Sequence, residues 1–170
     1  WAKAAGDAAL QVVGELLYKA GRTVEYIMLW IEKDLLTGVG AIVRGLFKAG
    51  ATVADLMAWA AKRAVQVVKD TVTELIALGV TLTQLVADTL TQPQNALKNL
   101  VQAFAEIGKT TKDIVQAAVV QPAEDAARRV FQALKDLGKT ALEVLGAAFE
   151  LGGSAIALAF TLIIEWFPGA

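Results

Sequence analysis

The sequence predicts an all-α fold, an α-solenoid of short helical hairpins with about 29 residues per repeat. Three observations lead to this prediction. A Gly-x-Thr triplet recurs along the 170 residues at spacings of 29, 29, 29 and 30. A second break, at Pro93, Pro122 or Gly152, stands fourteen residues after three of the triplet glycines. The segments between breaks have helical periodicity, as in 124–137, where charged and apolar residues fall on opposite faces.

Each triplet combines a helix stop with a helix start. Gly suits the left-handed position that follows a helix, and Thr two residues later can cap the next helix by accepting a bond from an N–H of its first turn. At four of the five triplets, the residue three positions after Thr can complete or approximate a capping box. The predicted repeat caps are Gly21 and Thr23, Gly50 and Thr52, Gly79 and Thr81, Gly108 and Thr110, and Gly138 and Thr140.

The period divides one domain, 1–170, into five fuller repeats and a partial one. Residues 1–20 are the partial repeat, 21–49, 50–78, 79–107 and 108–137 are repeats, and 138–170 is an apolar terminal repeat. Trp1 aligns with Trp30 and Trp59, so we expect the chain to begin inside a unit, as a processed protein or a segment of a longer array. One apolar column passes through the repeats: Leu17, Leu46, Leu75, Phe104 and Leu134.

The second repeat lacks an obvious break at its midpoint. Residues 54–78, from Ala54 to Leu78, can therefore run as one long helix. The other repeats are expected to be hairpins of two short helices.

The composition excludes several classes of function. The net charge is −1, which leaves no basic field for nucleic acid. The chain has no Cys and no His, so disulfides are impossible and the usual zinc ligands are missing. No stretch reaches the roughly 18 apolar residues of a membrane-spanning helix, and the first residues lack the pattern of a secretory signal.

Two segments resemble the end of a phosphate-binding loop, "IGKTT" at 107–111 and "LGKTA" at 137–141. A true loop needs another Gly five residues before the second one, and it follows a β-strand. Those positions are Ala103 and Ala133, and the preceding segments have helical patterns. We therefore predict that the chain binds no nucleotide.

Residues for catalysis are also missing. Ser154 is the only Ser, it has no His partner, and its position suits a helix cap. Asp55, Asp113 and Glu143 are acidic, but helix capping already explains their positions. The three aligned Trp residues suit packing better than a ladder for a ligand. The sequence therefore predicts no enzyme, no cofactor and no catalytic or metal-binding residues.

The last repeat is far more apolar than the others. Residues 151–170 contain one acidic residue, Glu165, and no basic residue. A terminal repeat normally has a polar outer face, and a helix that is apolar on every side is expected to be covered. We predict a helix over 155–167, buried largely by the N-terminal helix of a neighbouring subunit. The predicted interface residues are Ile156, Leu158, Phe160, Leu162, Ile163, Ile164, Trp166 and Phe167, with Leu10, Val13 and Leu17 on the other side.

The arrangement is similar in outline to α-solenoids such as the tetratricopeptide and HEAT families. The period is shorter than theirs, and the tetratricopeptide W-L-G-Y pattern is absent. The recurring L-G-x-T capped hairpin also resembles the tandem helical repeats of large bacterial secreted or tail-associated proteins, and this resemblance covers most of the chain. It implies a structural role and a secreted or cell-surface location, although the residues themselves assign no compartment.

The expected function is that of a non-catalytic structural module. It self-associates into an oligomer or filament through the apolar C-terminal helix, so its partner is a second copy or the rest of a longer repeat chain. The alternative is a lipid- or membrane-associated helical protein whose apolar surplus faces acyl chains. A second alternative is a solenoid that binds a peptide on its concave face.

Overall fold

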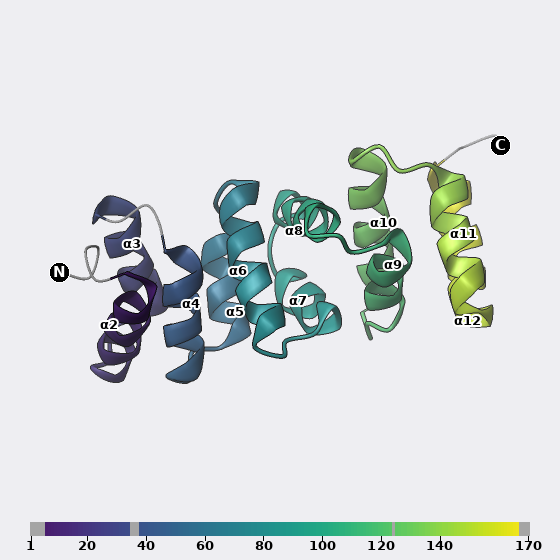
Figure 1. Cartoon of the computed structure of the whole chain (residues 1–170). Helices are drawn as coiled ribbons and strands as arrows, with labels where there is room; N and C mark the ends of the chain where they lie inside the picture. The colour runs from purple at the N-terminus through teal and green to yellow at the C-terminus, as the bar shows by residue number, and fades with distance from the viewer. Residues whose placement is uncertain (1–5, 35–37, 124, 167–170) are drawn as a thin grey trace.

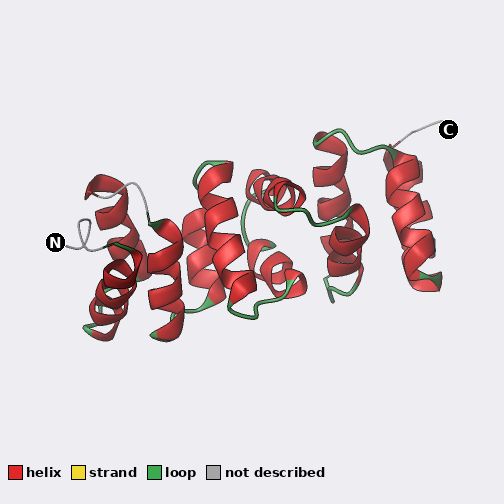
Figure 2. Cartoon of the chain, viewed as in Figure 1, coloured by secondary structure: helices red, strands yellow, loops and turns green. Residues whose placement is uncertain are grey.

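The computed structural model describes residues 6–34, 38–123 and 125–166, and all the elements in these ranges are helices (Figure 2). The prediction of an all-α fold is confirmed for this part of the chain. The helices are α2 (Asp7–Lys19), α3 (Val24–Asp34), α4 (Val39–Lys48), α5 (Val53–Ala60), α6 (Val65–Ala77), α7 (Leu82–Thr89), α8 (Gln94–Glu106), α9 (Thr111–Val119), α10 (Ala126–Asp136), α11 (Ala141–Leu151) and α12 (Gly153–Trp166).

The helices follow one another along one long axis, with α2 and α3 at one end and α11 and α12 at the other (Figure 1). Helices α3, α5, α7, α9 and α11 pack consecutively against one another. Helices α2, α4, α6, α8 and α10 do the same, and α12 contacts both α10 and α11. Two rows of helices therefore lie side by side along the molecule.

The core between the rows is one continuous cluster of buried apolar side chains, from Leu10 of α2 to Leu162 of α12. Trp59 is the largest of its fully buried side chains. Two buried polar residues, Thr71 and Thr89, donate their hydroxyls to the carbonyl oxygens four residues earlier, at 2.9 and 2.8 Å. Burial of apolar surface is the main source of stability in such a core.

The turns at the five triplets share one pattern of hydrogen bonds. In the turn at Gly79, the N–H of Val80 donates to the carbonyl oxygen of Leu75 at 2.9 Å, and the N–H of Gly79 donates to that of Ile76 at 3.0 Å. This Schellman motif needs a left-handed residue, and Gly79 has a φ of +98°. The same two bonds close the other four turns. In each turn, the N–H of the residue after Gly donates to a carbonyl five residues earlier, and these acceptors are the residues of the apolar column: Leu17, Leu46, Leu75, Phe104 and Leu134.

Each triplet Thr caps the helix that follows. Its hydroxyl accepts a hydrogen bond from the backbone N–H three residues later, at 3.1 or 3.2 Å in every case. At Thr110 the bond is reciprocated, because the carboxylate of Asp113 accepts from the N–H of Thr110 at 3.0 Å and completes a capping box. The five donors to these Thr hydroxyls are Tyr26, Asp55, Gln84, Asp113 and Glu143.

The expectation of one long helix over 54–78 is wrong, because α5 ends at Ala60 and α6 begins at Val65. Ala64, before α6, has φ −63° and ψ 156°, close to the values of −59° and 158° for Pro93 before α8. Both residues stand fourteen positions after a triplet Gly. Ala has no local preference for a break. We attribute the break to packing, since α5 packs on α7 while α6 packs on α8.

Candidate interaction surface

Helix α11 exposes an apolar side chain at a position that is buried elsewhere in the molecule. Leu145 lies seven residues after Gly138 and is half-buried. The residues seven positions after the four earlier triplet glycines are all 0% exposed. We attribute their burial to the next helix of the same row, and α11 has no following helix of its row in the described ranges. The four buried counterparts of Leu145 are Met28, Met57, Val86 and Val115.

The same comparison applies to α12. Position 167 lies one repeat of 29 residues after Gly138 and so corresponds to a triplet Gly, and positions in α12 are counted back from it. Phe160, seven residues before 167, is 49% exposed, whereas the residues seven before the four triplet glycines from Gly50 onward are 0% exposed. Ile163, four residues before 167, is half-buried. The buried counterparts are Val43, Val72, Val101 and Phe131 for Phe160, and Leu46, Leu75, Phe104 and Leu134 for Ile163.

These side chains form an apolar surface at the C-terminal end of the molecule, which we call the end face. It consists of Leu145 and Phe149 from α11 and Ile156, Phe160 and Ile163 from α12. Phe149 is 55% exposed, and its ring meets the ring of Phe160 at an angle of 86°, with centroids 6.2 Å apart. This edge-to-face contact joins the two helices. Two further large apolar side chains are exposed on the described parts of the same helices: Leu142 and Ile164.

The predicted interface residues at the C-terminal end have different environments. Ile156 and Ile163 are half-buried, while Phe160 and Ile164 are exposed. Leu158 is half-buried and packs against the core. The remaining predicted residues at this end are Leu162, which is buried, and Trp166 and Phe167, whose side chains lie outside the described part of the chain.

Helix α12 is buried on one side by its own chain, so a partner could cover only its other side. Ala155, Ala159 and Leu162 are 3%, 0% and 4% exposed and belong to the core. At the other end of the molecule, Leu10 is likewise buried, at 4% exposed. Leu10 and Leu162 are therefore not available to a partner. Val13 and Leu17 are half-buried on α2, far along the axis from α12 (Figure 1).

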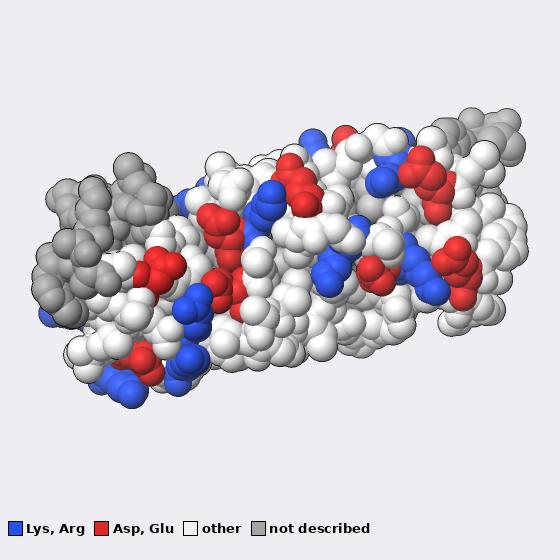
Figure 3. Space-filling view, viewed as in Figure 1, with Lys and Arg blue, Asp and Glu red and all other residues white. Residues whose placement is uncertain are grey.

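The charged residues of α11 and α12 are all acidic, and each is paired with a basic residue from elsewhere in the chain. Helices α11 and α12 carry three acidic residues and no basic residue. Their carboxylates lie 3.6, 3.7 and 3.2 Å from basic groups that precede α11 in the chain. Figure 3 shows a right-hand end that is mainly uncharged, with acidic and basic groups beside it. The pairs are Glu143 with Lys139, Glu150 with Lys112, and Glu165 with Arg128.

Arg44 joins three helices of one row. Its guanidinium donates to both carboxylate oxygens of Glu74 on α6, at 2.8 and 3.1 Å, and to the amide oxygen of Gln11 on α2, at 3.3 Å. The hydrogen bond to Glu74, and then its negative charge, raise the pKa of Arg44 above its usual value. The two-pronged geometry fixes the spacing of α4 and α6.

Arg129 is a second polar bridge, from α10 to the loop between α7 and α8. Its guanidinium donates to the carbonyl oxygens of Leu90 and Gln92 and to the side-chain oxygen of Gln94. The amide of Gln94 returns a bond to the carbonyl oxygen of Arg129 at 2.7 Å. Sequence analysis missed this role. The local pattern of α10 gave no signal for it, since the acceptors lie 35 to 39 residues earlier in the chain.

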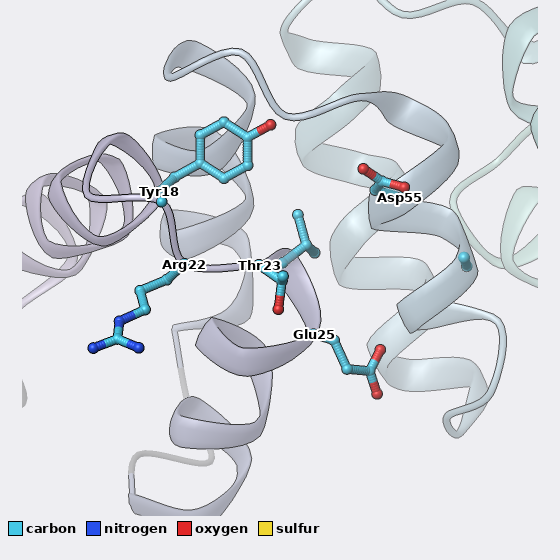
Figure 4. Close-up of a pocket in the computed structure, with 8 residues that line it drawn as sticks. Tyr18, Arg22, Thr23, Glu25 and Asp55 are labelled. Atoms are coloured by element: carbon cyan, nitrogen blue, oxygen red, sulfur yellow. The ribbon is translucent and has the colours of Figure 1, made fainter.

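A hollow of about 580 Å³ lies beside the turn between α2 and α3 and faces α5 (Figure 4). It brings Glu25 and Asp55 into one surface with Tyr18 and Thr23. The hydroxyl of Thr23 already accepts the capping bond, and Arg22 lies over the ring of Tyr26, 4.9 Å from its centroid. The hollow therefore offers two carboxylates but no nucleophile with a general base beside it among its lining residues, and we assign it no reaction.

The described residues contain no group of three or more His, Cys, Asp or Glu side chains placed to hold a metal ion. Among the same residues, no helix is both long enough and apolar enough to cross a membrane. Ser154 lies within the first turn of α12. Of the three aligned Trp residues, Trp59 is 1% exposed and lies in the core, so it offers no surface to a ligand.

No protein-family model, no curated protein and no solved structure matches this chain. The end face is therefore interpreted from its own geometry.

Proposed function

We propose that this chain is a non-catalytic structural module, an α-solenoid of hairpins of about 29 residues that self-associates through its C-terminal end. One observation carries the proposal. The end face has apolar side chains that are exposed or half-buried, although their counterparts along the molecule are almost all buried. Uncovered apolar surface of this kind marks an interaction site.

Sedimentation velocity over a wide range of concentration tests the proposal. The parent protein should assemble as its concentration rises, in buffer without lipid. The double variant Phe160→Lys with Ile163→Lys should remain a monomer, since two charges would enter the contact, and circular dichroism should show its helices retained. A parent that stays monomeric at every concentration, or a double variant that assembles like the parent, would refute self-association through α12.

Lipid is the second candidate for the partner, because acyl chains could also cover the exposed Leu142, Phe149, Phe160 and Ile164. The described residues at this end give little attraction for anionic membranes, since the bases Lys112, Arg128 and Lys139 are each paired with an acid of α11 or α12. Liposome flotation separates the two functions. Flotation of a monomer on neutral and anionic vesicles would support lipid binding, whereas assembly without vesicles supports the structural module.

A further inference from the structure

A second hollow lies between α8 and α10, beside the turn that joins α8 to α9. Its volume is about 380 Å³, within the range of sites that hold small molecules. We propose that this hollow binds a small carboxylate with a branched apolar tail. The proposal goes beyond the structural module and does not depend on self-association.

The apolar part of the hollow is formed by the core and by its edge. Val101, Ile114 and Leu134 are 0% to 1% exposed, so the core itself makes one side of the hollow. Leu137 is half-buried and Ala105 is exposed, and both also line the hollow. A ligand with an apolar tail would cover these two side chains and remove its own tail from water.

Polar side chains line the same hollow and have no role in holding the fold together. Among the described residues, none of them makes a side-chain hydrogen bond or an ion pair. They are Gln102, Glu106, Lys109 and Thr111. Lys139 lines the hollow as well, and its partly exposed pair with Glu143, at 3.6 Å, is of a kind that contributes little to stability. A carboxylate can therefore take the ammonium of Lys109 in a charge-assisted bond.

The corresponding positions of the neighbouring repeats differ from this set. One repeat earlier, counted from the triplet Gly, these four positions hold Thr73, Ala77, Val80 and Leu82. One repeat later, the counterparts of Gln102 and Glu106 are Gln132 and Asp136, and these two are bonded to each other at 2.8 Å. Of the three locations, the one between α8 and α10 is therefore the one that combines an amide, a carboxylate, an ammonium and a hydroxyl that the fold does not use.

This chemistry suits a carboxylate on an apolar tail better than an anion alone. The tail would lie on Ala105 and Leu137, and the carboxylate would accept from Lys109 with the amide and hydroxyl as neutral donors. Glu106 is exposed and lines the same hollow, so it can accept from an ammonium group. Two sources share the tail and the carboxylate: a branched carboxylic acid, and an apolar amino acid whose ammonium also meets Glu106.

Titration of the full chain with 4-methylpentanoate, followed by two-dimensional NMR, tests the site without changing any residue. The expected result is a saturable shift of the backbone amides of Gln102, Lys109 and Thr111. Acetate lacks the apolar tail and 3-methylbutylamine lacks the carboxylate, so each should bind at least about tenfold more weakly. Equal binding of either compound, or the absence of a saturable shift at these amides, would overturn the proposal.

Leucine distinguishes the two sources, because it adds an ammonium group to 4-methylpentanoate. Tighter binding of leucine would support the site and assign it to an apolar amino acid. Weaker binding of leucine, with 4-methylpentanoate still saturable, would support the site and assign it to the branched acid.

Substitutions then locate the carboxylate. Lys109→Met removes the charge from a side chain of similar length, and the affinity for 4-methylpentanoate should fall by about tenfold or more. Lys135→Met makes the same change at an exposed position of α10 outside the hollow and should leave the affinity unchanged. Ala105→Phe should block the hollow from its exposed side, and circular dichroism checks the fold of each variant. If Lys109→Met and Lys135→Met weaken binding equally, net charge explains the binding and the proposed site is wrong.

Discussion

The backbone N–H of Val80 lies 2.9 Å from the carbonyl oxygen of Leu75, the bond that ends α6 and turns the chain toward α7. The side chain of Leu75 is at the same time fully buried in the core. One residue therefore closes the turn with its backbone and anchors the helix with its side chain. Because the bond needs Gly79 in a left-handed conformation, the turn and the packing of α6 depend on each other.

Gly79→Ala should destabilise the protein by about 1 kcal/mol, since an L-residue at this positive φ is strained. Gly146→Ala is the matched control, because Gly146 lies within α11 and an added Cβ would meet no atom within 4 Å. That change should be neutral or stabilise by up to about 1 kcal/mol, as Ala favours helix. Urea denaturation measures both. Equal effects of the two substitutions would contradict the role given to the turn.

Arg129→Lys should destabilise the protein by about 2 kcal/mol, because Lys cannot reproduce a guanidinium that reaches several acceptors at once. Arg128→Lys makes the same chemical change one residue away. Its pair with Glu165 is largely exposed, at 61% and 49%, so the effect should stay within about 0.5 kcal/mol. Thermal and urea unfolding of the two variants give the comparison. A larger loss for Arg128→Lys would show that the bridge from α10 contributes little.

The capping box at Thr110 should make a small contribution to stability that depends on pH. The backbone N–H of Thr110 and then its hydroxyl lower the pKa of Asp113 below its usual value. A lowered pKa in the folded state adds stability above the unfolded pKa of about 4, and this stability is lost as the pH falls through the folded value. Asp113→Asn should therefore be less stable than the parent at pH 6, and the gap should narrow toward pH 3.

Melting temperatures from pH 6 to pH 3 test this prediction. The difference should be modest, because Asp113 is close to solvent and its charge is screened. The Gln84 turn is the natural comparison, since Thr81 caps α7 there without a carboxylate. Thr81→Ala should change stability by a similar amount at both pH values, because it removes only the hydroxyl cap. If the stability difference between the parent and Asp113→Asn stays constant with pH, the charge of the Asp113 carboxylate does not contribute to the cap.

Magnesium with ATP or GTP should not raise the melting temperature. Gly108 and Gly138 end α8 and α10, and the Thr two residues later caps the following helix, so neither segment forms a phosphate loop. A site filled at 100 times its dissociation constant would stabilise by about 2.7 kcal/mol, which a thermal scan detects easily. A saturable rise in melting temperature would restore the nucleotide-binding interpretation of these segments.

Sequence analysis located the turns because their signals are local. Gly79 and Thr81 lie within three residues of each other, and their roles follow from backbone geometry alone. It missed the break at Ala64, since Ala is a strong helix former and the break arises from the packing of α5 and α6 on different helices. It also missed the bridge made by Arg129, whose acceptors lie 35 to 39 residues away in the chain. Contacts at that distance carry no signal in local periodicity.

For the end face, the apolar composition of 151–170 was evident from the sequence. Which side of α12 its own chain covers, and which side stays uncovered, was not. A helix that is apolar on all sides does not reveal which side its own chain covers. In the structure, Ala159 and Leu162 are buried in the core, whereas Phe160 is exposed and Ile163 is half-buried on the end face. Phe149 was not among the predicted interface residues because it belongs to α11, and the sequence alone did not indicate that both helices contribute to one surface.

The two-row arrangement also affects how the molecule unfolds. The main packing partners of each helix lie within three elements of it in the chain, so few contacts tie the middle of the molecule to its ends. Helices α2 and α12 have neighbours on fewer sides than α6 or α8. Loss of structure should therefore start at the termini and move inward, with amide hydrogens in α6 and α8 exchanging last. A partner bound to the end face would slow exchange in α11 and α12 and leave α2 as the place where opening begins.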